Sequence, residues 1–253
     1  MGCLAQMDTS GLSLSEDQQT AIRALSYDRA CKVAIKFSRA WWVEFGVEPG
    51  SGGSSATDLP VRTVVYPSWI DDNDPSKPAT IIVSYTWALD ATRMGALIQS
   101  PSDPAQNKQL LDVILSNLSR IYNNKITAGE LKNLVLEHHA FAWQHNPNTA
   151  GAYAFFGPGQ FTSLYPAVQC PAAKGRFYMA GECVSTHHGW IVGALDSAYM
   201  QLLSFLVRFG LIDKAIELKE SWFGDGKGCL VDEMWEKHIY WKPKLSEGVV
   251  MDS

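Results

Sequence analysis

The stretch from Gly175 to Phe205 reads GRFYMAGECVSTHHGWIVGALDSAYMQLLSF, and it decides the fold. Its first part, Phe177 to Ala180, is apolar and predicts a strand that ends at Gly181-Glu182. A loop of small and polar residues follows, and a helix is expected to begin near Trp190. The apolar residues of this helix recur at three- and four-residue spacing, which predicts one buried stripe formed by Ile191, Leu195, Ala198, Leu202 and Phe205.

This arrangement of strand, Gly-Glu, loop, His-Gly-Trp and helix resembles the C-terminal flavin-binding segment of the FAD-dependent amine oxidases (flavin monoamine oxidase superfamily). The likeness is closest to their L-amino-acid oxidase branch. It implies non-covalent FAD, with Glu182 hydrogen-bonded to the ribityl or pyrophosphate region, and with room for a flat ring left by Gly189 and Gly193. Unpaired N–H groups and the positive dipole at the helix start would favour charge on the reduced flavin. The implied cofactor-binding residues are Gly181, Glu182, Gly189, Trp190, Ile191 and Ala194. The alternative is an ordinary strand–loop–helix corner with a buried tryptophan.

A second segment, KVAIKF from Lys32 to Phe37, alternates apolar and polar residues and predicts a strand with Val33, Ile35 and Phe37 on one face. The resemblance implies that Lys32 is the catalytic lysine, which holds a water against flavin N5. On this strand alone, a lysine in contact with solvent is the simpler interpretation.

Aromatic residues supply the expected substrate site. The resemblance implies that the Tyr85 hydroxyl binds the substrate carboxylate, and that Trp143 and Tyr153 wall the cavity opposite Trp190. Apolar walls exclude water and hold the substrate carbon in position. The alternative is that these aromatic residues only pack in the core.

Two departures from the family pattern bear on this assignment. No GxGxxG turn between a strand and a helix occurs in the sequence, and the glycine clusters PGSGGSS and FGPGQF do not fit that context. Four residues before Lys32, where the family has a secondary arginine, this chain has Asp28, and Arg29 follows. Two interpretations stay open: Arg29 replaces that arginine as a substrate ligand, or Asp28 favours a basic substrate side chain.

The rest of the sequence predicts an α+β (α/β) fold. Helices are expected at 13–25 (with a Ser13–Glu16 capping box), at 107–122, from Thr127 (boxed by Glu130) and at 212–221. Strands at 59–66 and 80–85 lie close to the Lys32 strand in sequence, which favours antiparallel pairing. We expect a mixed-sheet substrate-binding domain at 27–170, with pieces of a Rossmann-like FAD-binding domain at 1–26 and 171–211. A polar tail would follow at 212–253.

Composition narrows the classes of partner. The net charge of -5 is spread without a basic stripe, so nucleic-acid binding is not expected. No uninterrupted run of about 18 apolar residues predicts a membrane span, and no signal peptide is recognised, so the cytoplasm is the default location. The histidine pairs 138–139 and 187–188 lack carboxylates or cysteines at ligand spacing, and no metal site is expected. A homo-oligomer stays open.

The expected activity is oxidative deamination of an L-amino acid with O2, giving an imine and then an oxo acid, ammonia and hydrogen peroxide. The resemblance covers residues 2–207 and corresponds to the C-terminal half of an oxidase. Two alternatives remain: a truncated, non-catalytic fragment of such an oxidase, and a polyamine or monoamine oxidase.

Overall fold

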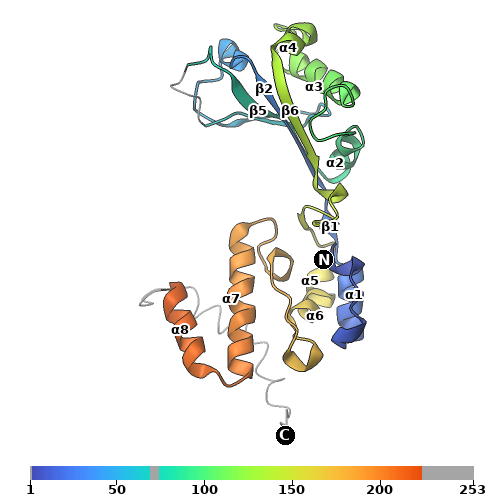
Figure 1. Ribbon diagram of the computed structural model, residues 1–253, viewed down its shortest axis with the longest axis vertical. Helices are drawn as coiled ribbons and strands as arrows, with labels where there is room; N and C mark the ends of the chain where they lie inside the picture. Colours follow the sequence, from blue (N-terminus) through green and yellow to red (C-terminus); the bar gives the residue numbers. More distant parts are fainter. Residues whose placement is uncertain (1, 69–73, 224–253) are drawn as a thin grey trace. The chain divides into compact units, whose positions relative to one another are not determined.

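The computed structural model describes residues 2–68 and 74–223 (Figure 1). Contacts divide the chain into two compact units, Met1–Ser197 and Ala198–Ser253, and the boundary lies within helix α7. The first unit contains both β-sheets and every residue predicted to bind flavin or substrate.

The larger sheet has five strands in the order β3-β4-β5-β2-β6. Their bounds are Ala30–Phe37 (β2), Ser54–Ala56 (β3), Thr63–Val65 (β4), Ala79–Trp87 (β5) and Val135–Ala142 (β6). All four pairs of neighbours are antiparallel, which confirms the predicted pairing. The mixed character expected of the sheet is limited to one isolated parallel bridge between Arg62 and Tyr85. The predicted α+β class is confirmed.

Strand β2 lies between β5 and β6 and alternates as predicted, with Val33, Ile35 and Phe37 fully buried. The neighbouring strand β6 was not predicted from the sequence. Its segment, VLEHHAFA, carries polar side chains because β6 is the edge strand, and Glu137 and His139 are exposed to solvent.

Helices α2 (Ala88–Gly95), α3 (Lys108–Ile121) and α4 (Ala128–Leu134) line one side of this sheet (Figure 1). Helix α3 confirms the helix predicted at 107–122, and its residues Leu110, Ile114 and Leu118, at four-residue spacing, are fully buried. The capping box of Thr127 and Glu130 is also confirmed. The core between helices and sheet includes the tryptophan pair of the 3-10 helix η3 (Trp41–Phe45).

Helix α1 (Glu16–Ala24) begins later than predicted, and its capping box is formed by Ser15 and Gln18 rather than Ser13 and Glu16. Ser13 has a left-handed backbone (φ 47°), so the regular helix cannot include it. Helix α1 packs against α6 (Tyr165–Gln169), and the buried residues of this second core are Ala21, Ile22, Leu25, Tyr165, Val168, Met179 and Val184.

The predicted strand at Phe177–Ala180 is wrong. Only Phe177 makes a β-bridge, to Ala172, and residues 178–180 have no regular structure. A strand needs a neighbour for its backbone N–H and C=O groups, and no strand of the described residues pairs with this segment.

The remaining elements of the first unit are short. They are β1 (Tyr27–Asp28) antiparallel to β7 (Tyr153–Ala154), α5 (Gln160–Ser163), and the 3-10 helices η1 (Leu4–Gln6), η2 (Ser10–Leu12), η5 (Trp143–His145), η6 (Ala173–Gly175) and η7 (Glu182–Val184).

Helix α7 (Ile191–Arg208) confirms the helix predicted near Trp190, and α8 (Ile212–Phe223) confirms the one predicted at 212–221. In the second unit, Tyr199 and Leu203 of α7 pack on Ala215 of α8. By length and composition alone α7 could cross a membrane, a test that core helices of globular proteins also pass. Residues 224–253 of the predicted polar tail lie outside the described residues.

Candidate active site

Lys32, Tyr85 and Trp143 form one cluster at the end of the larger sheet. Lys32 lies opposite Tyr85 of β5 in the strand register. Its amine lies 4.6 Å from the centroid of the Tyr85 ring and 5.5 Å from that of Trp143. An ammonium over an aromatic face is attracted by the negative electrostatic potential of the π electrons, so the two rings favour this position of the Lys32 amine. The structure thus brings three predicted site residues together.

Tyr153, the fourth predicted residue of the substrate site, lies on the small sheet. It lies opposite Asp28 in the β1–β7 register, and its hydroxyl donates a hydrogen bond to Asp28 Oδ2 (3.1 Å). Burial, together with the nearby charge of Asp28, raises the pKa of Tyr153 to about 12, and Tyr85 and Glu182 contribute in the same direction. Tyr153 therefore bonds Asp28 through its hydroxyl and lies with its ring against Gly189 of the segment predicted to bind flavin.

Arg29, the predicted substrate ligand, lies apart from this cluster. Its side chain is exposed and forms no ion pair within the described residues. Its backbone carbonyl accepts a hydrogen bond from Ala88 N (3.1 Å). The arrangement favours Asp28 over Arg29 as the charged group of the site.

Glu182 ties three segments of the chain together. Its Oε1 accepts hydrogen bonds from Gly189 N (2.7 Å) and Ala154 N (2.9 Å). Its Oε2 accepts one from the Tyr27 hydroxyl (3.3 Å). Burial, then the charges of Cys183 and Glu182, raises the pKa of Tyr27. Charge-assisted bonds of this kind are stronger than neutral ones, so one carboxylate holds the loop at Gly189, next to Trp190, against both strands of the small sheet.

The glycines of this segment have separate roles. Gly181 (φ 133°) donates its N–H to Ser197 Oγ (3.1 Å), and Gly189 (φ 76°) lies against the Tyr153 ring, where an added Cβ would be 3.8 Å away. At Gly193 an added Cβ would lie 2.3 Å from the carbonyl oxygen of His187. The space beside Gly193 is therefore filled by the loop. The expectation that Gly193 leaves room for a flat ring is wrong.

The start of α7 presents an exposed apolar surface. The exposed fraction is 70% for Trp190 and 82% for Ile191, and Ala194 is partly exposed. Trp190 makes no ring contact within the described residues, so the structure does not bring it to Trp143 and Tyr153 as the opposite wall of a cage. The apolar stripe expected to be buried is also open here, because Ile191 and Leu195 are exposed.

His188 was not recognised from the sequence as part of this site. Its ring is stacked on Phe161 (centroids 5.1 Å apart) and meets Phe156 edge-on (4.4 Å). Its Nε2 is buried and has no hydrogen-bond partner within the described residues. Burial lowers the pKa of His188. The sequence did contain a signal for this packing. The aromatic residues Phe155, Phe156 and Phe161 around FGPGQF need a flat side chain to pack against, and His188 supplies it.

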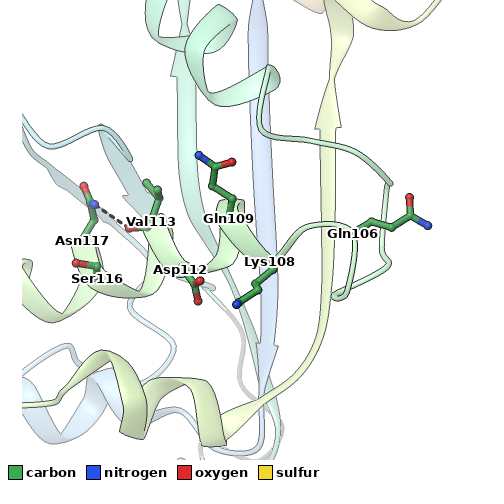
Figure 2. Close-up of a pocket in the computed structure, with 7 residues that line it drawn as sticks. All are labelled: Gln106, Lys108, Gln109, Asp112, Val113, Ser116 and Asn117. Carbon is green, nitrogen blue, oxygen red and sulfur yellow. Dashed lines mark hydrogen bonds between the residues drawn. The ribbon is translucent and has the colours of Figure 1, made fainter.

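Other polar groups lie away from this site. A hollow of about 670 Å³ runs along α3, lined by Gln106, Lys108, Gln109, Asp112, Val113, Ser116 and Asn117 (Figure 2). It includes none of the predicted site residues. His138 bonds Asn107 through Nε2 (2.8 Å), and no group of three His, Cys, Asp or Glu residues in the described chain could hold a metal ion.

Residues 2–201 match the family described as flavin containing amine oxidoreductase. The chain belongs to this family. It is 40% identical over 238 residues to L-amino-acid oxidase 4 of Hebeloma cylindrosporum, covering 88% of this chain and 37% of that protein. It is 32% identical over 186 residues to the L-amino-acid oxidase of Siganus canaliculatus, covering 74% and 32%. The chain thus spans about a third of the length of these curated relatives.

A solved structure shares the fold. Cyclohexylamine oxidase from Brevibacterium oxydans superposes with a TM-score of 0.59 at 16% identity, over 82% of this chain and 41% of that chain. Family membership implies a flavin cofactor, and the residues at the start of α7 fit its ring. The exposed apolar side chains of Trp190 and Ile191 offer a surface for it, and Gly189 adds no side chain beside them.

Proposed function

We propose that this chain forms the substrate-binding region and one side of the cofactor site of an FAD-dependent oxidase that deaminates L-amino acids. The observation that supports this proposal most directly is the position of Tyr153. Its ring lies against Gly189 of the segment proposed to bind flavin, and its hydroxyl is bonded to Asp28, four residues before Lys32. A residue proposed to line the substrate site therefore lies against the segment proposed to bind the cofactor.

Non-covalent FAD would be held by the segment from Gly181 to Ala194. Trp190 and Ile191 would contact the ring. Glu182 would order the Gly189 backbone beside it, since the Gly189 N–H is bonded to this carboxylate. Bound flavin supplies the acceptor for the hydride that leaves the substrate α-carbon, and its reoxidation by O2 gives hydrogen peroxide.

The other roles belong to side chains of the sheets. The Tyr85 hydroxyl would donate a hydrogen bond to the substrate carboxylate. The Lys32 amine, fixed over two rings, would hold a water and move protons. Trp143 and Tyr153 would exclude bulk water and orient the α-carbon. Hydrolysis of the imine product to an oxo acid and ammonia completes a balanced reaction, in which the amino acid, O2 and water are consumed. We also propose the division into a substrate-binding region at 27–170 and cofactor-domain pieces on either side.

The test is flavin binding followed by turnover. The purified chain is supplied with FAD, and we expect flavin absorbance to be retained on gel filtration and peroxide to form with L-amino acids. Glu182→Gln should weaken FAD binding, because a neutral amide holds the loop less strongly than a carboxylate. Glu16→Gln, at an exposed position in the first turn of α1, is the matched control and should bind FAD as the unchanged chain does.

Tyr85→Phe tests the substrate class. Loss of one hydrogen bond to a charged group should raise KM for L-amino acids roughly tenfold or more, and leave KM for simple amines unchanged. An unchanged KM for amino acids would favour a monoamine or polyamine oxidase.

One observation favours a second candidate, a chain that is not catalytic by itself. Trp190 and Ile191 are 70% and 82% exposed, so the surface proposed to contact the ring is covered from one side only. If the protein is colourless and forms no peroxide with any L-amino acid, the non-catalytic chain is the only candidate that remains.

A further inference from the structure

Asp28 carries the charge that is bonded to Tyr153, a residue proposed to line the substrate site. Its Oδ2 accepts a hydrogen bond from the Tyr153 hydroxyl (3.1 Å), and the negative field there is one cause of the raised pKa of Tyr153. The Tyr153 ring in turn lies against Gly189 of the segment proposed to bind flavin. The Asp28 carboxylate is therefore part of the wall that a bound substrate would meet.

This carboxylate lacks a cation. Asp28 is partly buried, and no Lys, Arg or His of residues 2–68 and 74–223 lies within ion-pair distance of it. Asp90 shows the contrast, because it is bonded to both Arg62 (2.6 Å) and Arg93 (3.2 Å). Removing a carboxylate from water without an opposite charge is unfavourable, so a site of this kind gains most from a ligand that brings a positive group.

The reacting amino group is not the charge that Asp28 would hold. An amine gives up hydride from its α-carbon in the neutral form, and a carboxylate beside it would favour the unreactive ammonium. The α-carboxylate of the substrate is assigned to Tyr85. The remaining part of an L-amino acid is its side chain.

We propose that Asp28 selects L-amino acids with a cationic side chain, an ammonium or a guanidinium, over neutral and acidic ones. This inference rests on the proposed oxidase function. It assigns the discriminating charge to Asp28 rather than to Arg29, whose side chain is exposed.

The test compares L-lysine, L-leucine and L-glutamate as ligands of the full chain supplied with FAD. Equilibrium binding is measured by tryptophan fluorescence and calorimetry, and turnover by peroxide formation. We expect L-lysine to bind at least about tenfold more tightly than L-leucine, which corresponds to about 1.4 kcal/mol. L-Glutamate should bind more weakly than either, since its side chain would face a like charge.

Variants assign the preference to one residue. Asp28→Asn keeps the shape of the side chain and should reduce the lysine-to-leucine ratio to about one, with leucine binding changed less than about twofold. Asp28→Glu keeps the charge and should keep the preference. Asp58→Asn, an exposed aspartate in the loop before β4, is the matched control and should leave the ratio unchanged. Thermal unfolding of each variant checks that it folds.

The outcomes separate this inference from the proposed function. If FAD binds and leucine is oxidised as well as lysine, or if Asp28→Asn keeps the preference, the inference is overturned and the oxidase assignment stands. If FAD does not bind but an Asp28-dependent preference for lysine is measured, the inference stands and the oxidase assignment fails. If no flavin and no amino acid binds, both fail.

Discussion

The core of the larger sheet buries its tryptophans, whereas the segment from Gly181 to Ala194 leaves its tryptophan exposed to solvent. In the sheet, Trp41 is fully buried among Phe37, Trp42 and Tyr122, with ring centroids 5.0–5.8 Å apart. At the start of α7, Trp190 is 70% exposed. The first region is stabilised by packing, and the second is held by hydrogen bonds to Glu182.

This difference separates stability from binding. Burial of large side chains supplies most of the free energy of folding, whereas an exposed apolar surface contributes little until something covers it. In the segment from Gly181 to Ala194 the backbone is held in place while the Trp190 indole stays in solvent, an arrangement that suits the binding of a flat ligand. Substitutions should therefore affect folding in one region and ligand binding in the other.

The largest expected effect compares two tryptophans. Trp41→Ala should lower the free energy of unfolding by about 3–5 kcal/mol, because it leaves a cavity in a close-packed core. Trp190→Ala should change it by less than about 0.5 kcal/mol, as an exposed side chain does. Urea denaturation followed by circular dichroism measures both.

FAD affinity should rank the two variants the other way. Trp190→Ala removes a proposed ring contact and should weaken FAD binding, whereas any folded Trp41→Ala protein should bind as the unchanged chain does. Equal losses of stability at both positions would mean that Trp190 is packed in solution, and the contrast between the regions would not hold.

Substitutions of two glycines test the backbone of the segment from Gly181 to Ala194, and their expected effect on stability is intermediate in size. Gly193→Ala places a methyl group against His187 O and Ser185 Oγ, which would lie 2.3 and 2.5 Å away, and should lower the free energy of unfolding by about 1–3 kcal/mol. Gly129→Ala in α4 is the matched control. Its nearest neighbour would be Thr127 Oγ1 at 3.9 Å, and alanine should stabilise this helix by up to about 1 kcal/mol. If Gly193→Ala is also stabilising, the loop at His187 does not lie against α7 as described.

The same contrast explains what the sequence could predict. Strand β2 and helix α3 follow from periodicity, because both bury one regular face within this chain. Strand β6 does not, since an edge strand carries polar residues on its open side. The strand at Phe177–Ala180 fails for the opposite reason: it is apolar, but pairing depends on a neighbouring strand, which local composition does not reveal.

For the candidate site, the Lys32 cluster was predicted by resemblance, and the strand register brings its members together. The choice between Asp28 and Arg29 could not be made from spacing alone, because it depends on which of two adjacent side chains faces Tyr153. The packing of His188 depends on contacts with residues about thirty positions away, and no local pattern encodes them.

The smallest expected effect concerns His188, whose ring packs the cofactor segment onto the aromatic residues that precede α6. Burial against Phe156 and Phe161 lowers its pKa, and Glu182 and the backbone of Cys183 and Ser185 act in the opposite direction. Above the unfolded-state pKa of about 6.5 the ring is neutral in both states, and its contribution to stability is complete. As the pH falls below that value the unfolded chain binds a proton first, so stability should decrease until the folded ring is protonated too.

Unfolding measured by urea between pH 7.5 and 5.5 checks this, with a variant that removes one titrating ring. His188→Phe keeps an aromatic ring and should flatten the decrease, and the remaining slope should include buried His138, whose pKa is lowered in the same direction. A slope that His188→Phe leaves unchanged would mean that this histidine stays in water.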